Sequence, residues 1–206
     1  MNLKEIWGYA QSQKFTLFKE KQMKKIVVSV IALALVLSAI AAVAQDKSYT
    51  ITPKIAYGYV VDSDSRDLSG ATLGILVEGQ FESIPVGFET GYLYNDESCA
   101  LLGTPGKYKA HQVPIMATYN QAFSPDNPFY FKVGAGISVN EYKWKDTAGL
   151  GVSVSESKTR FAFKAGVGYK FAENFCAELT YADYGKSDAV GGIKTGQVQL
   201  ALGYSF

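Results

Sequence analysis

Apolar and polar residues alternate through most of the chain from residue 49 on. In residues 129–139, large apolar side chains such as Phe131 alternate with polar or small ones such as Lys132. This period of two is typical of β-strands, whose successive side chains point to opposite faces. Most such segments have about the ten residues that a tilted strand needs to cross a bilayer. The expected strands cover residues 49–59, 71–81, 86–94, 112–119, 129–139, 161–171, 175–182 and 196–206.

The connections between these expected strands alternate in length. The short ones are residues 82–85, 122–128 and 172–174, and the longer ones are residues 62–70, 95–110, 140–158 and 184–194. Short turns at one end and long loops at the other are the pattern of an outer-membrane barrel. The sequence therefore predicts an all-β fold, an eight-stranded antiparallel up-and-down transmembrane β-barrel. An even strand number places both termini in the periplasm and the long loops outside the cell.

A soluble eight-stranded barrel would show the same alternation, with its apolar face inside and its polar face outside. The size of the side chains on the polar face separates the two alternatives. Glycines recur on that face, at Gly58, Gly74, Gly87, Gly91, Gly134, Gly136, Gly166, Gly168 and Gly203. Small residues suit a crowded lumen, so we expect the bulky aromatic residues to face lipid as interfacial girdles. Gly79 falls on the apolar face and breaks this pattern.

An export signal precedes the expected barrel. Lys24 and Lys25 stand before an apolar run, which ends in a small-x-small cleavage pattern at Ala44. This layout is typical of a secretory signal peptide, although the apolar run is also about long enough for a membrane-spanning helix. The predicted domains are an upstream extension that need not be translated (1–22), a signal peptide (23–44) and the barrel (45–206).

Several segments resemble the small outer-membrane β-barrel family, which includes OmpA-type barrel domains, the OmpX/Ail-like group and the opacity proteins. They are the fourth strand HQVPIMATYN, the hairpin YKFAENFCAELTYADYG and the terminal LALGYSF. The resemblance implies an integral protein of the cell outer membrane, in contact with outer-membrane lipid and lipopolysaccharide. It also implies that the last strand, with Leu202, Tyr204 and Phe206, is the signal that the outer-membrane assembly machinery recognises.

Charged residues recur on the inward face of the expected barrel. They are Lys54, Glu78, Glu89, Lys132, Lys164 and Glu178. Most lie a few residues in from the periplasmic ends of their strands, so several can share one level. Opposite charges at one level are expected to pair, because an unpaired charge away from bulk water is costly. The sequence predicts a structural ion network that fills the lumen, and the alternative is a narrow or gated pore with the same lining.

Catalytic chemistry has few candidates in this sequence. A lipid A deacylase on this architecture would use a serine nucleophile activated by histidine. The chain has one histidine, His111, near the outer rim of the fourth strand and followed by Gln112 rather than a serine pairing. We therefore predict a protein that is not an enzyme and has no cofactor, and a lipid A-modifying enzyme is a distant alternative.

The acidic residues Asp62, Asp64 and Asp67 lie close together in the first long loop. They depart from a calcium-binding loop, since Arg66 stands where a ligand belongs, so we expect a solvated loop and no metal site. Cys99 and Cys176 fall at opposite ends of the barrel, beyond the ~7 Å limit between the Cα atoms of a disulfide. Two free thiols are predicted.

The formal net charge of +1 gives no strongly basic face for nucleic acid. The function predicted from these observations is that of a monomeric barrel with a structural or surface-interaction role, in adhesion or envelope integrity. Its long loops would contact lipopolysaccharide or an extracellular ligand. The alternative is a small porin or carrier that passes small solutes across the outer membrane.

Overall fold

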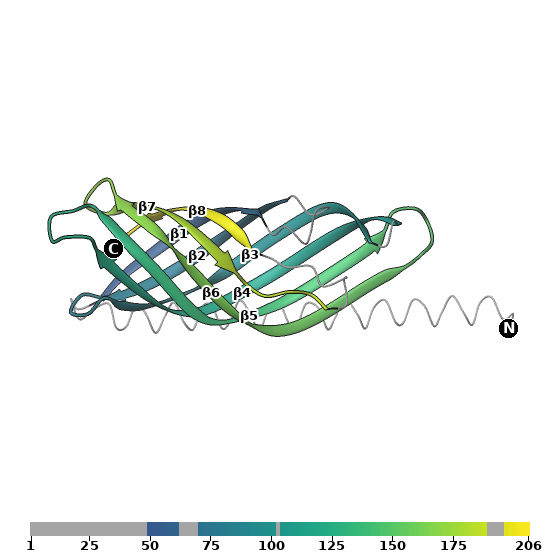
Figure 1. Cartoon of the computed structure of the whole chain (residues 1–206), viewed down its shortest axis with the longest axis horizontal. Coiled ribbons are helices and arrows are strands. Elements are labelled where there is room, and N and C mark those ends of the chain that lie inside the picture. The colour runs from purple at the N-terminus through teal and green to yellow at the C-terminus, as the bar shows by residue number, and fades with distance from the viewer. Residues whose placement is uncertain (1–48, 62–69, 102–103, 189–195) are drawn as a thin grey trace, which may run out of the picture. The chain divides into compact units, whose positions relative to one another are not determined.

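The computed structural model is a closed barrel in which every strand is antiparallel to its neighbours (Figure 1). The structure describes residues 49–61, 70–101, 104–188 and 196–206. The strands are β1 (Tyr49–Val60), β2 (Ala71–Phe81), β3 (Val86–Leu101), β4 (Thr104–Ala122), β5 (Phe129–Asp146), β6 (Ser153–Lys170), β7 (Phe175–Asp183) and β8 (Gln197–Tyr204). They follow one another around the barrel in chain order. The predicted eight-stranded up-and-down fold is confirmed.

The barrel closes where β8 pairs with β1. The register runs from Lys54 opposite Gly203 to Val60 opposite Gln197. Beyond the ladder, the Phe206 amide donates a hydrogen bond to the Ile51 carbonyl at 2.9 Å. Closure matters because an unpaired strand edge in lipid would leave backbone groups without hydrogen-bond partners.

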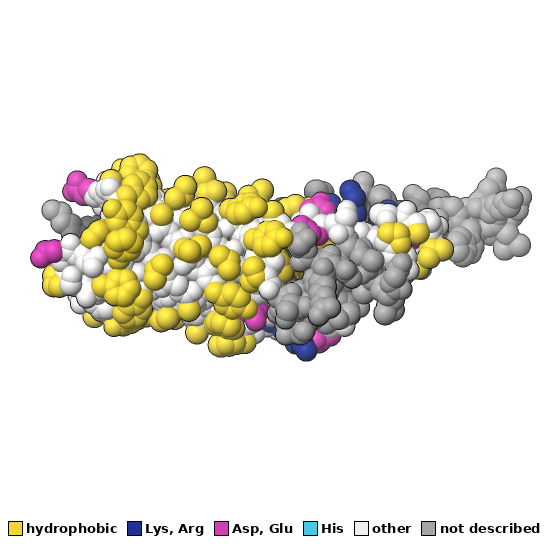
Figure 2. All heavy atoms as spheres, turned by 45° about the horizontal axis from the view of Figure 1, so that its top comes forward, with side chains coloured by type: hydrophobic (Ala, Val, Ile, Leu, Met, Phe, Trp, Pro, Cys, Tyr) yellow, Lys and Arg dark blue, Asp and Glu magenta, His cyan; other side chains and the backbone are white. Residues whose placement is uncertain are grey.

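The outer face of the barrel is apolar and the inner face is polar. Neighbouring residues of β1 show the contrast, since Ile55 is 71% exposed and Lys54 is 2% exposed. Similarly exposed side chains surround the barrel, among them Leu73, Ile75, Ile115, Ile137, Phe161, Leu179 and Leu202. Figure 2 shows hydrophobic side chains across this outer face. We call this part of the barrel the belt; its polarity is the reverse of that of a soluble barrel.

Gly79, the glycine on the apolar face, is covered by an aromatic ring. A Cβ atom at Gly79 would overlap the Tyr49 hydroxyl. The Tyr49 ring also contacts Phe81 and Phe88, with centroid distances of 5.1 and 6.0 Å. Such packing of an aromatic ring over a strand glycine restores a continuous surface, so the interruption of the sequence pattern is filled in the fold.

Two of the predicted long loops are wrong in extent, because most of their residues continue the strands. Strands β3 to β6 have 16, 19, 18 and 18 residues, and they run well beyond β7 and β8 in Figure 1. Residues 95–101 pair with 104–110, and residues 140–145 pair with 153–158. We call this part of β3 to β6 the hairpin extension. The charged residues of the hairpin extension are typical of a loop, although apolar and polar residues continue to alternate there.

The other connections define the two ends of the barrel. Short connections at residues 82–85, 123–128 and 171–174 lie at the end opposite the hairpin extension. We call these ends the short-turn end and the hairpin end. The predictions for residues 1–22 and 23–44, and for most of the first and last long loops, lie outside the described residues. Within the described residues, no helix is long and apolar enough to span a membrane.

Candidate functional site in the barrel lumen

The structure brings the six predicted inward charges together in the lumen. Lys54 comes from β1, Glu78 from β2, Glu89 from β3, Lys132 from β5, Lys164 from β6 and Glu178 from β7. All six are buried, with 0 to 4% of each residue exposed. We call this group the ion cluster. Its members meet because each occupies an inward-facing position near the short-turn end of its strand.

Lys132 contacts all three carboxylates of the ion cluster. Its Nζ atom lies 2.7 Å from Glu89, 2.9 Å from Glu78 and 3.2 Å from Glu178. Lys54 also contacts all three, with its Nζ atom 2.6 Å from Glu178, 3.7 Å from Glu89 and in contact with Glu78. Lys164 pairs with Glu89. Three positive and three negative charges therefore balance, which is the condition under which buried charges are tolerated.

Two neutral residues complete the hydrogen bonding of the carboxylates. The Tyr130 hydroxyl donates to Glu178 Oε1 at 2.8 Å, and the Asn120 amide donates to Glu78 Oε1 at 2.7 Å. Sequence reasoning missed both residues as members of this site. The inward parity of Tyr130 was a usable signal, whereas the place of Asn120 depends on its pairing opposite Lys132, which the sequence does not give.

A glycine on the inner face makes room for the ion cluster. A Cβ atom at Gly203 of β8 would lie 2.9 Å from Lys54 Cγ and 3.0 Å from the Cys176 sulfur. Side-chain carbons rarely approach so closely, so a larger residue would displace the lysine. The preference for small residues on the polar face follows here from the space that the charged side chains occupy.

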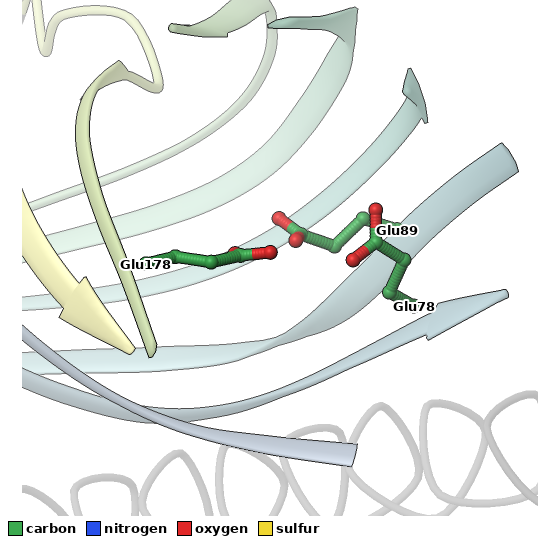
Figure 3. A group of neighbouring side chains, drawn as sticks. All are labelled: Glu78, Glu89 and Glu178. Atoms are coloured by element: carbon green, nitrogen blue, oxygen red, sulfur yellow. The ribbon is translucent and has the colours of Figure 1, made fainter. Parts of the chain in front are cut away.

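The three carboxylates converge from β2, β3 and β7, as Figure 3 shows. Oxygen atoms of Glu78, Glu89 and Glu178 lie within 4.8 Å of one another, a spacing that could hold a metal ion. The Lys132 ammonium contacts all three. Lysine thus supplies the positive charge that a cation would otherwise bring, and the arrangement fits an ion-paired plug better than a metal site.

An apolar layer packs above the ion cluster. Its buried residues are Ala56, Leu76, Leu93, Met116, Ala162, Ala182, Tyr184 and Ala201. Ala56 follows Lys54 by two positions along β1, and Leu76 precedes Glu78 by two along β2. Because β1 runs toward the hairpin end and β2 runs away from it, this layer lies between the ion cluster and the hairpin end. It separates the charges from that opening of the barrel.

The remaining predicted residues lie away from the ion cluster. His111 lies on the outer face, where its Nδ1 atom shares a hydrogen bond with the Tyr92 hydroxyl. The Cys176 thiol is free and buried. The side chain of Cys99 and the acidic residues predicted in the first long loop lie outside the described residues.

The end of β8 lies against β7 and presents apolar side chains outward. Leu202 is 55% exposed and Phe206 is 77% exposed. The Tyr204 ring packs edge-on against both Phe175 and Phe206, each at a centroid distance of 4.8 Å. These contacts make the end of the chain part of the aromatic rim at the short-turn end.

A closed barrel with an apolar exterior and an ion-paired lumen defines an integral β-barrel membrane protein. The chain belongs to the family described as outer membrane protein beta-barrel domain, whose model matches residues 29–206. The resemblance to small outer-membrane barrels is thereby confirmed. The curated proteins give no match to this chain.

Solved structures of small surface barrels share the fold. Neisserial surface protein A is similar over 77% of this chain and 97% of its own, with 17% identity and a TM-score of 0.56. Ail, the attachment invasion locus protein of Yersinia pestis, in complex with the heparin analogue sucrose octasulfate, is similar over 77% and 97%, with 18% identity and a TM-score of 0.52. At these identities the likeness concerns the fold.

Proposed function

We propose that this protein is a non-enzymatic barrel of the cell outer membrane with a closed lumen, and that it acts through its outer surface and hairpin extension. The observation that carries the proposal is the neutral, buried ion cluster, with Lys132 in contact with three carboxylates. A small barrel whose lumen is filled by paired side chains suits a structural or surface-interaction role. Such a role includes adhesion and envelope integrity.

The apolar layer supports the closed lumen independently. A hydrated ion crossing the lumen would have to pass Leu76, Leu93 and Met116, which are 0 to 2% exposed. Passage through an apolar constriction requires a desolvation that is costly for an ion. Two successive barriers of different chemistry therefore oppose conduction.

A surface role fits the orientation expected for the barrel. With the short turns and both termini in the periplasm, the hairpin extension would stand outside the cell. The two similar solved structures are named as a surface protein and an attachment protein, the latter in complex with a heparin analogue. These names give a precedent for a small barrel that acts through its exterior.

The surroundings of His111 support a non-enzymatic role. Its hydrogen-bond partner is Tyr92, and its ring lies 5.1 Å from that of Tyr94. Among the described residues, no serine hydrogen-bonds to this imidazole, whereas a deacylase would need one as its nucleophile. Lipid A from cells with and without the protein should therefore give identical mass spectra.

Conductance in planar bilayers tests the closed lumen. The wild-type protein should give no steady single-channel openings. Lys132→Ala, which removes one of the two lysines that contact all three carboxylates, should introduce openings, because incompletely paired carboxylates attract water and cations. The matched control is Lys170→Ala, which removes an exposed lysine at the short-turn end of β6. Steady conductance of the wild type would overturn the closed lumen and favour the small porin or carrier.

The terminal strand is proposed to act as the signal for the outer-membrane assembly machinery, through Leu202, Tyr204 and Phe206. Deletion of Phe206 should sharply reduce insertion in cells. The same purified chain should still fold into detergent, because Phe206 adds one hydrogen bond and one ring contact to a closed ladder. Normal surface levels of the deletion variant would remove the assembly role and leave Phe206 as a girdle residue.

A further inference from the structure

The outer face of the hairpin extension carries two rows of facing lysines. Lys109 of β4 lies directly opposite Lys143 of β5, and Lys107 lies opposite Lys145 one row further from the belt. All four share the outward parity, while Tyr108 and Trp144 between them are buried on the inner face. We call these four residues the lysine rows.

Facing lysines are unfavourable for the barrel itself. Like charges directly opposite each other on an antiparallel pair repel and destabilise the sheet. Asp96 relieves the first row in part, with 3.1 Å to Lys109 Nζ, and Glu141 lies 3.1 Å from Lys143 Nζ. For the second row, Lys107 and Lys145, no ion pair is found among the described residues. An external anion would relieve this repulsion.

Serines flank the lysine rows on the neighbouring strands. Ser98 of β3 lies opposite Lys107, and Ser153 of β6 lies opposite Lys145. Ser155 lies opposite Lys143 in the first row. Both serines of the second row are exposed. Ammonium groups bordered by hydroxyl donors match the oxygen atoms of a phosphate group.

The lysine rows also lie close to the edge of the belt. Two positions from Lys109 toward the belt stands His111, and two further stands Val113, where the apolar outer face begins. On β5, Lys143 is followed in the same direction by Glu141 and Val139. The first row thus lies four residues, and the second row six residues, beyond the edge of the apolar outer face on both strands, on the side where lipid headgroups would meet water.

We propose that the lysine rows bind the phosphate groups of lipid A, the membrane anchor of lipopolysaccharide. The inference rests on the proposed orientation, with the hairpin end outside the cell. Lipid phosphate, rather than a soluble polyanion, is the expected ligand because the rows adjoin the belt. Bound lipid A would place its acyl chains on the belt and its phosphates between facing lysines.

The test measures binding of purified bisphosphorylated lipid A to the full-length protein in detergent micelles. The double variant Lys107→Gln/Lys145→Gln should bind about tenfold more weakly than the wild type, since two charge-assisted contacts are lost. Lys107→Arg/Lys145→Arg should retain binding. The control Lys186→Gln removes an exposed lysine beyond β7 at the same end of the barrel, and should bind as the wild type does. Heat-modifiable migration in gels verifies that each variant is folded.

Two further probes separate the possible outcomes. Dephosphorylated lipid A should bind wild type and Gln variant alike, and bisphosphorylated lipid A should raise the thermal midpoint of the wild type more than that of the variant. Unchanged affinity of the Gln variant for bisphosphorylated lipid A would overturn the proposal. Loss of binding to a soluble sulfated oligosaccharide, with lipid A binding intact, would also overturn it and make the rows a site for soluble polyanions.

Failure of this inference can be distinguished from failure of the proposed function. An epitope tag inserted in the β5–β6 turn, residues 147–152, reports orientation by antibody binding to intact cells. A tag that is inaccessible would contradict the orientation while leaving lipid A binding in micelles unaffected. A conducting wild type would contradict the closed lumen without changing the affinity for lipid A.

Discussion

The hairpin extension continues four of the eight strands of the belt, yet the two faces of these strands have opposite polarity in the two regions. In the belt part of β5, Val133 faces outward and Lys132 faces the lumen. Further along the same strand, Lys145 faces outward and Trp144 is buried on the inner face. The period of two is the same in both regions. Only the faces change, since the apolar side chains lie outside in the belt and inside in the extension.

The surroundings of the outer face explain this exchange. In the belt, lipid requires apolar side chains outside, so polar residues are confined to the lumen. Beyond the belt, the outer face meets water, and the inner face becomes the place for apolar burial. There Tyr108 and Tyr142 stack with a centroid distance of 6.1 Å, and Trp144 and Ala110 complete the cluster. The exchange of polarity marks where the barrel leaves the membrane.

The lysines on the inner face of the belt and on the outer face of the extension should therefore differ most in their response to removal of the charge. Lys132→Ala removes a lysine that contacts three buried carboxylates. We expect the free energy of unfolding to fall by about 3–5 kcal/mol, as when one partner of a buried ion pair is removed. Urea titration of the barrel in micelles measures this.

The matched control for that variant is Lys145→Ala, which makes the same substitution on the outer face of the same strand. It should leave stability unchanged or slightly increased, because a facing lysine is removed. The charge exchange Glu89→Lys/Lys132→Glu should recover part of the loss. Equal stability of Lys132→Ala and Lys145→Ala would contradict an ion cluster that stabilises the barrel.

A smaller effect is expected when a charge is placed on the outer face of each region. Val133→Arg puts a guanidinium near the middle of the belt and should cost about 2–4 kcal/mol of folding free energy in lipid vesicles. Ser157→Arg places the same group on the extension, opposite Glu141, and should be nearly neutral. If both variants unfold at the same urea concentration, the outer faces of the two regions do not meet different media.

Much of the barrel could be predicted from the sequence, because strand parity is visible without coordinates. The alternation around Lys132 or Glu178 is enough to assign each to the lumen. Parity does not give register, however. The cover of Gly79 by Tyr49 depends on which residues of β1 and β2 face each other, with Ile51 opposite Gly79. The contact of Asn120 with Glu78 likewise required the stagger of several strands.

The full length of the strands could not be predicted from a pattern that expects apolar side chains on the outer face throughout. Lys143 and Lys145 interrupt an apolar outer face, so residues 140–158 read as a loop. The continuing alternation of Tyr142 and Trp144 was the available signal. It has a strand period of two, but its apolar side chains lie on the opposite parity from those of the belt. A pattern that allows the apolar side chains of a strand to lie on either face would have predicted the hairpin extension.

The smallest expected effect concerns an ion group at the hairpin end, and it depends on pH. Asp188, beyond β7, lies 2.6 Å from Lys158 Nζ and also contacts Arg160 of β6. Hydrogen bonds from these two cations lower the pKa of the Asp188 carboxyl from 3.8 to about 2. Because the folded-state pKa lies below the ordinary one, its contribution is present above 3.8 and lost as pH falls toward about 2. After correction for the intrinsic pH dependence of amide exchange, the protection of residues 183–188 should therefore fall across that window in the wild type. Asp188→Asn should show fast exchange already at neutral pH, with little change in global stability, since the pair is exposed.

The control Asp126→Asn changes a carboxyl in the turn 123–128 and should leave this exchange unaffected. An equal acid response in Asp188→Asn and the wild type would mean that this ion group does not hold the segment to β6.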